Sequence, residues 1–273
     1  MAADSYADVS GLVERSAAAY ASSVPEHPAD DGFFGPGSVT WHLTTDLSSP
    51  IGGLRALMVQ ALHPLAMAGV DQHSDWRSDP VGRLAATSSY LTIVSVGDRA
   101  TAERVSERVR RVHEHVRGVD TVTGQPYAAG DPALLLWVHA AFVDSNIAAA
   151  QLFGSPLMAA DADRYVAEMV AAAKLVGVPA DMVPASVAGL ERYVESVRPI
   201  LRATPAARES MAYLLDPPGL DPDVAEIWQD IREGTIASLP DWARDRIAAA
   251  DTAALEDWGL RVLDAGSLDD VLA

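Results

Sequence analysis

Histidine and carboxylate side chains are the candidates for holding a transition metal in this chain of 273 residues, because the sequence contains no cysteine. The lack of thiolates excludes disulfides, cysteine-ligated zinc and iron–sulfur sites, and thiolate-ligated haem. The chain has seven histidines, and none follows His139. The sequence therefore places any metal chemistry in the part of the chain that ends at this residue.

His113 has the most distinctive surroundings of the seven histidines, in an arginine-rich segment that ends at Gly118. On a helix, Val109 and Val116 would share its face, which makes that face apolar, and Arg110 and Arg117 would flank it. A histidine on an apolar face is more often a hydrogen-bonded core residue than a metal ligand. The residues alone leave both interpretations open.

Arg83 and Thr87 form a second candidate group, because a spacing of four residues puts both on one face of the helix expected after Asp79-Pro80. A guanidinium and a hydroxyl beside apolar side chains suit a pocket that binds oxygen species or a carboxylate. The alternative is a surface arginine that pairs with one of the 38 acidic residues.

Two further histidines lie close together in the sequence. Asp71, His73 and Asp75 alternate, so an extended loop would turn all three to one side, as in a non-haem metal site. This spacing matches no established ligand motif, and a loop that caps the next helix is the simpler interpretation. His63, before Pro64 in an apolar helix, is expected in the core or in a pocket.

The surrounding elements are predicted to be helices almost throughout. Aspartates before prolines, Asp79 and Asp131, are expected to cap helices, as are Asp98 and Asp161. The segment 38–42 is the best candidate for a short extended piece. The pattern shows no repeat or linker, so we expect residues 1–273 to form a single all-α domain of about ten helices.

The composition of the chain disfavours two classes of binding partner. A net charge of −18 disfavours nucleic acid and anionic membranes, which both require clustered cations. No apolar run approaches the roughly 18 residues of a membrane span, and the acidic N-terminus is unlike a signal peptide. These features predict a soluble cytoplasmic protein. They make no prediction about its oligomeric state.

Several segments, in order along the chain, resemble one protein family. They are Phe34–Trp41, Gln60–Val70 with His73-Ser74, Asp79–Thr87 with Tyr90-Leu91, His113–Gly118, Tyr127-Ala128, Asp131-Pro132 and Trp137–Ala140. This set, which spans about residues 33–145, resembles the DUF2236 oxygenases, the family of latex-clearing protein (rubber oxygenase) and the MpaB-type oxygenase.

The resemblance implies a largely helical, globin-like core that binds haem b. His113, in the H-x-x-V-x-G pattern, would be the proximal iron ligand, and Arg83 and Thr87, in R-x-x-x-T, would line the distal side. Arg110 and Arg117 would pair with the haem propionates. His63, His73 and His139 are further candidates for distal or supporting positions.

The implied activity is that of a haem-dependent oxygenase or peroxygenase, which uses O2 or peroxide, and in some cases an electron donor, to oxidise a small hydrophobic substrate. Ala86 stands where rubber oxygenase has a lysine, and Leu65, Ala66 and Met67 occupy the region of its distal acid. Rubber cleavage is therefore not expected. The alternatives are a haem protein that senses or carries a gas, a non-haem metalloenzyme that uses Asp71, His73 and Asp75, and a metal-free helical binding protein.

Overall fold

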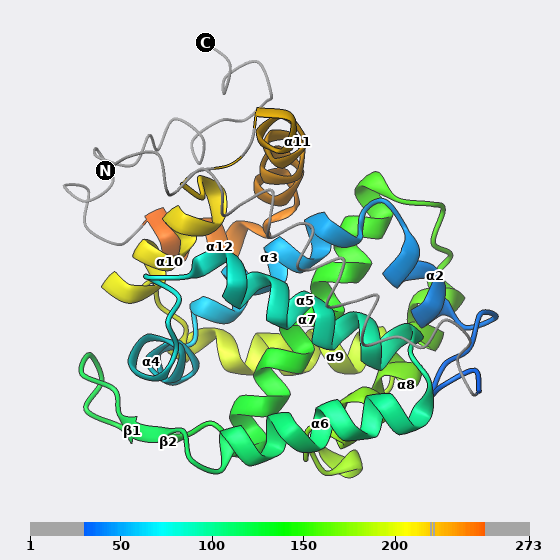
Figure 1. Ribbon diagram of the computed structural model, residues 1–273, viewed down its shortest axis with the longest axis horizontal. Helices are drawn as coiled ribbons and strands as arrows, with labels where there is room; N and C mark the ends of the chain where they lie inside the picture. Colours follow the sequence, from blue (N-terminus) through cyan, green and yellow to red (C-terminus); the bar gives the residue numbers. More distant parts are fainter. Residues whose placement is uncertain (1–29, 219, 221, 249–273) are drawn as a thin grey trace.

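The computed structural model describes residues 30–248, with the exception of 219 and 221. Its described part contains eleven α-helices and one small sheet (Figure 1). The helices are α2 (Val39–Thr45), α3 (Ser49–Ala61), α4 (Pro64–His73), α5 (Pro80–Val96), α6 (Arg99–His113), α7 (Pro132–Phe153), α8 (Ala159–Leu175), α9 (Val187–Val197), α10 (Pro205–Leu215), α11 (Pro222–Ser238) and α12 (Asp241–Ala248). Two short 3₁₀ turns, Ala180–Met182 and Arg198–Ile200, join later helices. The all-α prediction is confirmed.

Helix α7 is the central element, and its packing against α3 is the most extensive helix–helix contact of the described chain. The two helices approach closely where Gly52 of α3 faces Asn146 of α7, and a Cβ at Gly52 would lie only 3.1 Å from the Asn146 Cα. By length and composition α7 could cross a membrane, but 67% of its apolar window is buried inside the protein. Its role as the core helix therefore accounts for its apolar character.

The predicted helix caps are largely confirmed. The carboxylates of Asp79, Asp98 and Asp131 accept backbone N–H groups in the first turns of α5, α6 and α7. The prediction for Asp161 is wrong, because α8 begins at Ala159 and Asp161 lies within its first turn. There its negative charge interacts favourably with the positive end of the helix dipole.

Two local predictions require correction. The segment 38–42 is not extended: Ser38 caps α2, its hydroxyl accepting the Trp41 N–H at 3.0 Å, and the helix starts at the next residue. The structure also contains an antiparallel hairpin that the sequence did not predict, formed by β1 (Arg117–Val119) and β2 (Pro126–Ala128). With three residues each, these strands are too short for an alternating pattern to identify them.

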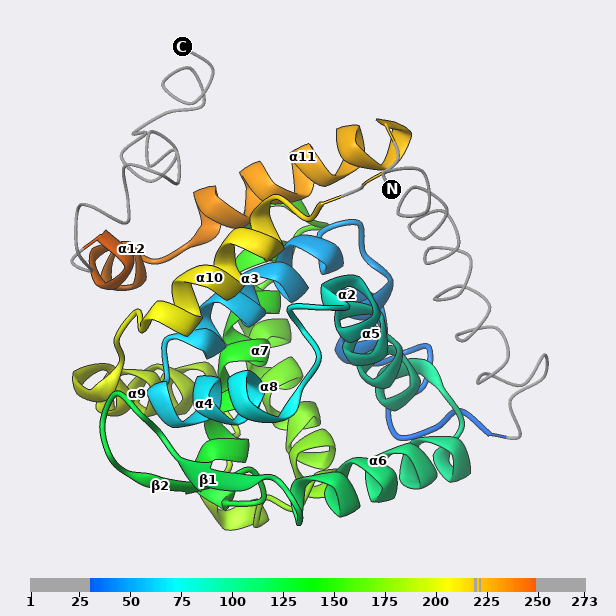
Figure 2. The same cartoon turned by 60° about the vertical axis from the view of Figure 1, so that its left-hand side comes forward.

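Helices α5 and α6 are joined by a short connection at Gly97-Asp98 and meet at an angle there (Figure 2). Tyr90 of α5 and Ser106 of α6 exchange a hydrogen bond of 3.3 Å across the pair. The last turn of α5 is buried, whereas none of its described side chains from Pro80 to Thr92 is fully buried. Arg83 is the only charged residue of this helix. A helix so apolar and so incompletely buried is suited to line a cavity for an apolar ligand.

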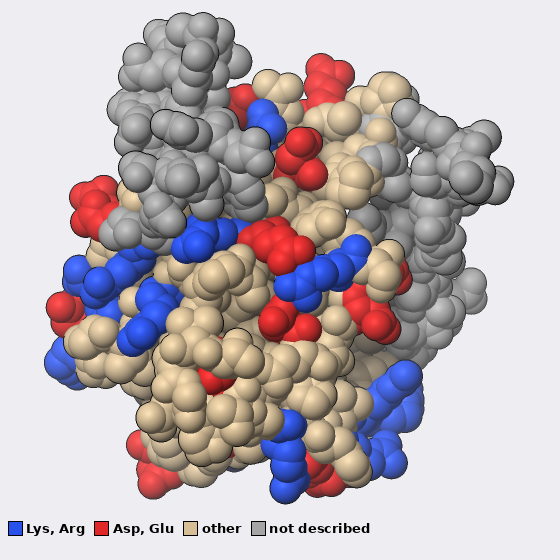
Figure 3. Space-filling view, turned by 90° about the vertical axis from the view of Figure 1, so that its left-hand side faces the viewer, with Lys and Arg blue, Asp and Glu red and all other residues tan. Residues whose placement is uncertain are grey.

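Charged side chains of both signs are interspersed on the face shown in Figure 3, around a broad uncharged area. The net charge of −18 is therefore not expressed as a uniformly acidic surface on this face. Elsewhere in the described chain, charges of opposite sign also pair: Arg77 forms ion pairs of 2.7 Å with both Asp71 and Glu209.

Candidate functional site

His113 is the last residue of α6, and its side chain is half-buried. Its Nδ1 atom is shielded from solvent and has no hydrogen-bond partner among the described residues. A buried polar atom without a partner costs free energy, so such atoms are concentrated where a ligand or an ordered water completes the site. The core-histidine interpretation required a hydrogen bond at this ring, and Nδ1 makes none within the described chain.

The guanidinium of Arg83, on α5, acts electrostatically on the imidazole of His113, at the end of α6. Burial lowers the pKa of His113, and the positive charge of Arg83 lowers it further. The ring is therefore neutral at pH 7. The neutral ring is the form in which imidazole coordinates a metal.

Arg83 and Thr87 are in contact, as their spacing predicted. The Arg83 guanidinium donates to the Thr87 hydroxyl oxygen at 2.5 Å, and that hydroxyl donates to the Arg83 backbone carbonyl at 3.0 Å. No described carboxylate lies within ion-pair distance of Arg83, so the surface-pair alternative is not supported among these residues.

The Arg83 side chain is accessible to solvent, yet burial by the surrounding protein lowers its pKa. His139 on α7 has the same combination: it is only half-buried, and the surrounding protein lowers its pKa to about 4.

His63 has a structural function that its sequence position did not reveal. It interrupts the helical run between α3 and α4, and its Nδ1 accepts the Ala66 N–H at 3.4 Å as the N-cap of α4. Its ring, only 6% exposed, packs 6.0 Å from the indole of Trp137. The expected burial of His63 is confirmed.

The two arginines expected beside haem propionates have other partners in this structure. Arg110 donates to the Leu175 carbonyl at 2.6 Å and pairs with Glu107, while Arg117 donates to the Glu114 carbonyl. These contacts connect α6 to α8 and secure the end of α6. A role for Arg110 and Arg117 toward propionates remains a prediction.

Asp71, His73 and Asp75 do not assemble into a metal site. Asp71 and His73 lie on the last turn of α4 rather than in an extended loop, so the predicted alternation to one side is wrong. Asp71 pairs with Arg77, and His73 packs edge-on against Tyr127 at 6.2 Å. Within residues 30–248, where described, no three histidine or acidic side chains are grouped to hold a metal ion.

Comparison with known protein families identifies the family of this chain. Residues 41–265 match the family described as ER-bound oxygenase mpaB/B′ and rubber oxygenase, catalytic domain. The chain belongs to this oxygenase family. No curated protein and no solved structure matches the chain. Membership of the mpaB/rubber oxygenase family supports an oxidoreductase of the oxygenase class, and the match extends the catalytic domain well beyond the motif-bearing part at about 33–145.

The roles of His113, Arg83 and Thr87 remain a prediction. The electrostatic effect of Arg83 on His113 depends on the packing of α5 and α6. One signal for that packing was available, because the short Gly97-Asp98 connection between two predicted helices favours helices that are neighbours in space.

Proposed function

We propose that this domain is a haem b-dependent oxygenase that acts on a small hydrophobic substrate, and that His113 would hold the haem iron. The observation that carries the proposal is the neutral imidazole of His113, with a buried Nδ1 that lacks a described partner and with the charge of the Thr87-bound Arg83 acting on it. Membership of an oxygenase family supports the enzymatic class.

The residues present fit a haem group. Imidazole is a common axial ligand of haem iron, and lowering the pKa of His113 keeps the ring available for coordination. The incompletely buried, apolar first turns of α5 suit contact with an apolar macrocycle. When bound, haem supplies the redox-active iron that activates O2 or peroxide, with an electron donor where O2 is the oxidant.

Arg83 is the group that would interact with a bound oxygen species. Its guanidinium carries five N–H donors, of which the structure engages one with Thr87, so the others remain available. The Thr87 hydroxyl hydrogen is engaged by the Arg83 carbonyl. Thr87 therefore acts as a positioning residue that fixes the direction of the guanidinium, and Arg83 provides the charge-assisted hydrogen bond.

The substrate is proposed to be a small apolar molecule rather than rubber. Ala86 next to Thr87 cannot supply the cation that a lysine would, and Leu65, Ala66 and Met67 of α4 offer no carboxylate as a base. Half-buried Leu84 and Leu91 of α5 offer apolar surface instead. The cytoplasm is the proposed location, which the burial of α7 inside the protein supports.

The test is the absorption spectrum of protein produced with adequate haem, compared for wild type, His113→Ala and the control His115→Ala. His115 is two residues away, is exposed, and its ring hydrogen-bonds to the Arg111 carbonyl and to no other described residue. We expect a Soret band in the wild type and the control, and a lost or shifted band in His113→Ala. An unchanged band in His113→Ala would refute the axial assignment, and no band in the wild type would refute haem binding.

A second measurement separates an oxygenase from a gas carrier. Reduced protein that activates oxygen should consume O2 and convert an apolar compound from a substrate panel. Reduced protein that holds O2 stably and forms no product would contradict the oxygenase assignment.

A further inference from the structure

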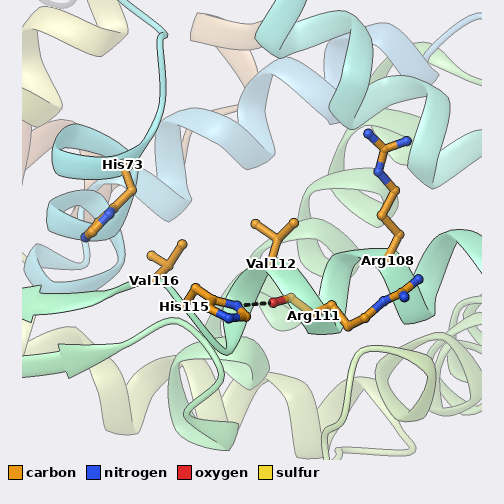
Figure 4. A pocket seen from close by; sticks show the side chains of 6 residues that line it. All are labelled: His73, Arg108, Arg111, Val112, His115 and Val116. Carbon is orange, nitrogen blue, oxygen red and sulfur yellow. Dashed lines mark hydrogen bonds between the residues drawn. The ribbon is translucent and has the colours of Figure 1, made fainter.

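An open pocket of about 420 Å³ lies at the C-terminal end of α6, and His113 is not among its lining residues (Figure 4). Arg108, Arg111, Val112 and His115 line it from α6 and the residues after it, at the i, i+3, i+4 and i+7 spacing of one helix face. His73 of α4 and Val116 complete the lining. The volume lies within the roughly 300–1,000 Å³ typical of small-molecule sites.

Both arginines of the pocket have guanidinium groups that are not saturated by acids. The guanidinium of Arg108 forms no hydrogen bond or ion pair with any described residue. Arg111 forms a long ion pair of 3.9 Å with Glu107, a carboxylate that it shares with Arg110. The charge of Arg108 is therefore available and that of Arg111 only partly neutralised, in a chain of net charge −18.

The same pocket also contains apolar surface. Val112 is 53% exposed, and in Figure 4 its side chain projects from the same side of α6 as that of Arg108. An isolated exposed valine needs no explanation, but Val112 and Val116 adjoin two guanidiniums in one concavity. This combination matches a ligand with an anionic head and a short apolar body.

We propose that this pocket binds the carboxylate of an amphipathic organic acid, with Arg108 and Arg111 holding the carboxylate and Val112 and Val116 contacting the apolar chain. None of these four residues belongs to the His113, Arg83 and Thr87 group, so substitutions in the pocket test this proposal separately from the haem proposal. Arginine is the residue suited to this ligand, because its planar fork of donors matches the two carboxylate oxygens.

Octanoate and octanol are matched probes, because they share the apolar chain and differ in the anionic head. Binding of each to the full-length protein is measured by calorimetry for wild type, the double variant R108Q/R111Q and the control R192Q. Arg192 is an exposed arginine of α9 outside the pocket. We expect octanoate to bind the wild type more tightly than octanol, and R108Q/R111Q to weaken octanoate by about tenfold with octanol unchanged.

The control R192Q should bind both probes as the wild type does, and circular dichroism should show that all variants are folded. Octanoate binding that is absent in the wild type, or equal in wild type and R108Q/R111Q, would overturn the proposal.

Haem also carries carboxylates, so the titration is repeated with haem-loaded protein. Octanoate that still binds supports a free organic acid as the occupant. Octanoate that is excluded by haem would assign the two arginines to the propionates and overturn the organic acid.

Discussion

The stability of the protein without added cofactor should depend on pH through His139. The surrounding protein lowers the pKa of this residue from 6.5 to about 4, so the unfolded chain binds a proton more readily than the folded one. Stability is therefore retained above pH 6.5 and lost as the pH falls toward 4. With 1.36 kcal/mol per pKa unit, moving from about pH 7.5 to about pH 5 should cost about 2 kcal/mol for this single group.

Urea unfolding at the two pH values measures this contribution, for wild type, His139→Gln and the exposed control His42→Gln. The variant His139→Gln cannot take up the proton, so its loss of stability between the two pH values should be smaller than that of wild type by about 2 kcal/mol. His63 and His113, whose pKa values are also lowered, contribute equally to all three proteins and cancel in the difference. The same pH dependence in His139→Gln and wild type would refute the reasoning, as would an effect of equal size in His42→Gln.

Three further predictions concern the site and the core. Replacement of Arg83 by glutamine removes the positive charge beside His113, so the pKa of His113 should rise in an NMR titration of the haem-free protein; an unchanged pKa would contradict their proximity. Asp144→Ala leaves the buried guanidinium of Arg55 without its carboxylate, which should lower the free energy of unfolding by about 2–3 kcal/mol in urea denaturation. A loss below about 0.5 kcal/mol would show that the pair adds little. Gly52→Val brings a side chain against α7 and should cost about 1–3 kcal/mol by the same assay, whereas an unchanged midpoint would mean that the helices can separate there.

Local signals in the sequence were sufficient for most of the helical framework. Asp79, Asp98 and Asp131 cap helices as predicted, because a cap depends on residues within a single turn. The prediction of an extended segment at 38–42 was wrong, because Ser38 caps a helix that begins at the β-branched residues after it. The hairpin after α6 was missed because pairing of three-residue strands is decided by residues across the turn, such as Gly118 opposite Tyr127.

The candidate site, like the fold, has features that the sequence predicts and features that depend on tertiary packing. The sequence by itself determined that His113, Arg83 and Thr87 are the residues to consider, since the absence of cysteine, the i, i+4 spacing and the ordered motifs are properties of the chain. It also determined the contact between Arg83 and Thr87, because four residues on a helix are spatial neighbours.

Only the tertiary structure decided which charges and cavities these residues encounter. The neutral state of His113 depends on its burial and on Arg83, which is thirty positions earlier in the sequence. His63 is a helix cap because a new helix, α4, begins at Pro64. The pocket at the end of α6 exists because His73 of α4 lies opposite it. Electrostatic potential and cavity shape are sums over atoms that are distant in sequence, and no local pattern contains them.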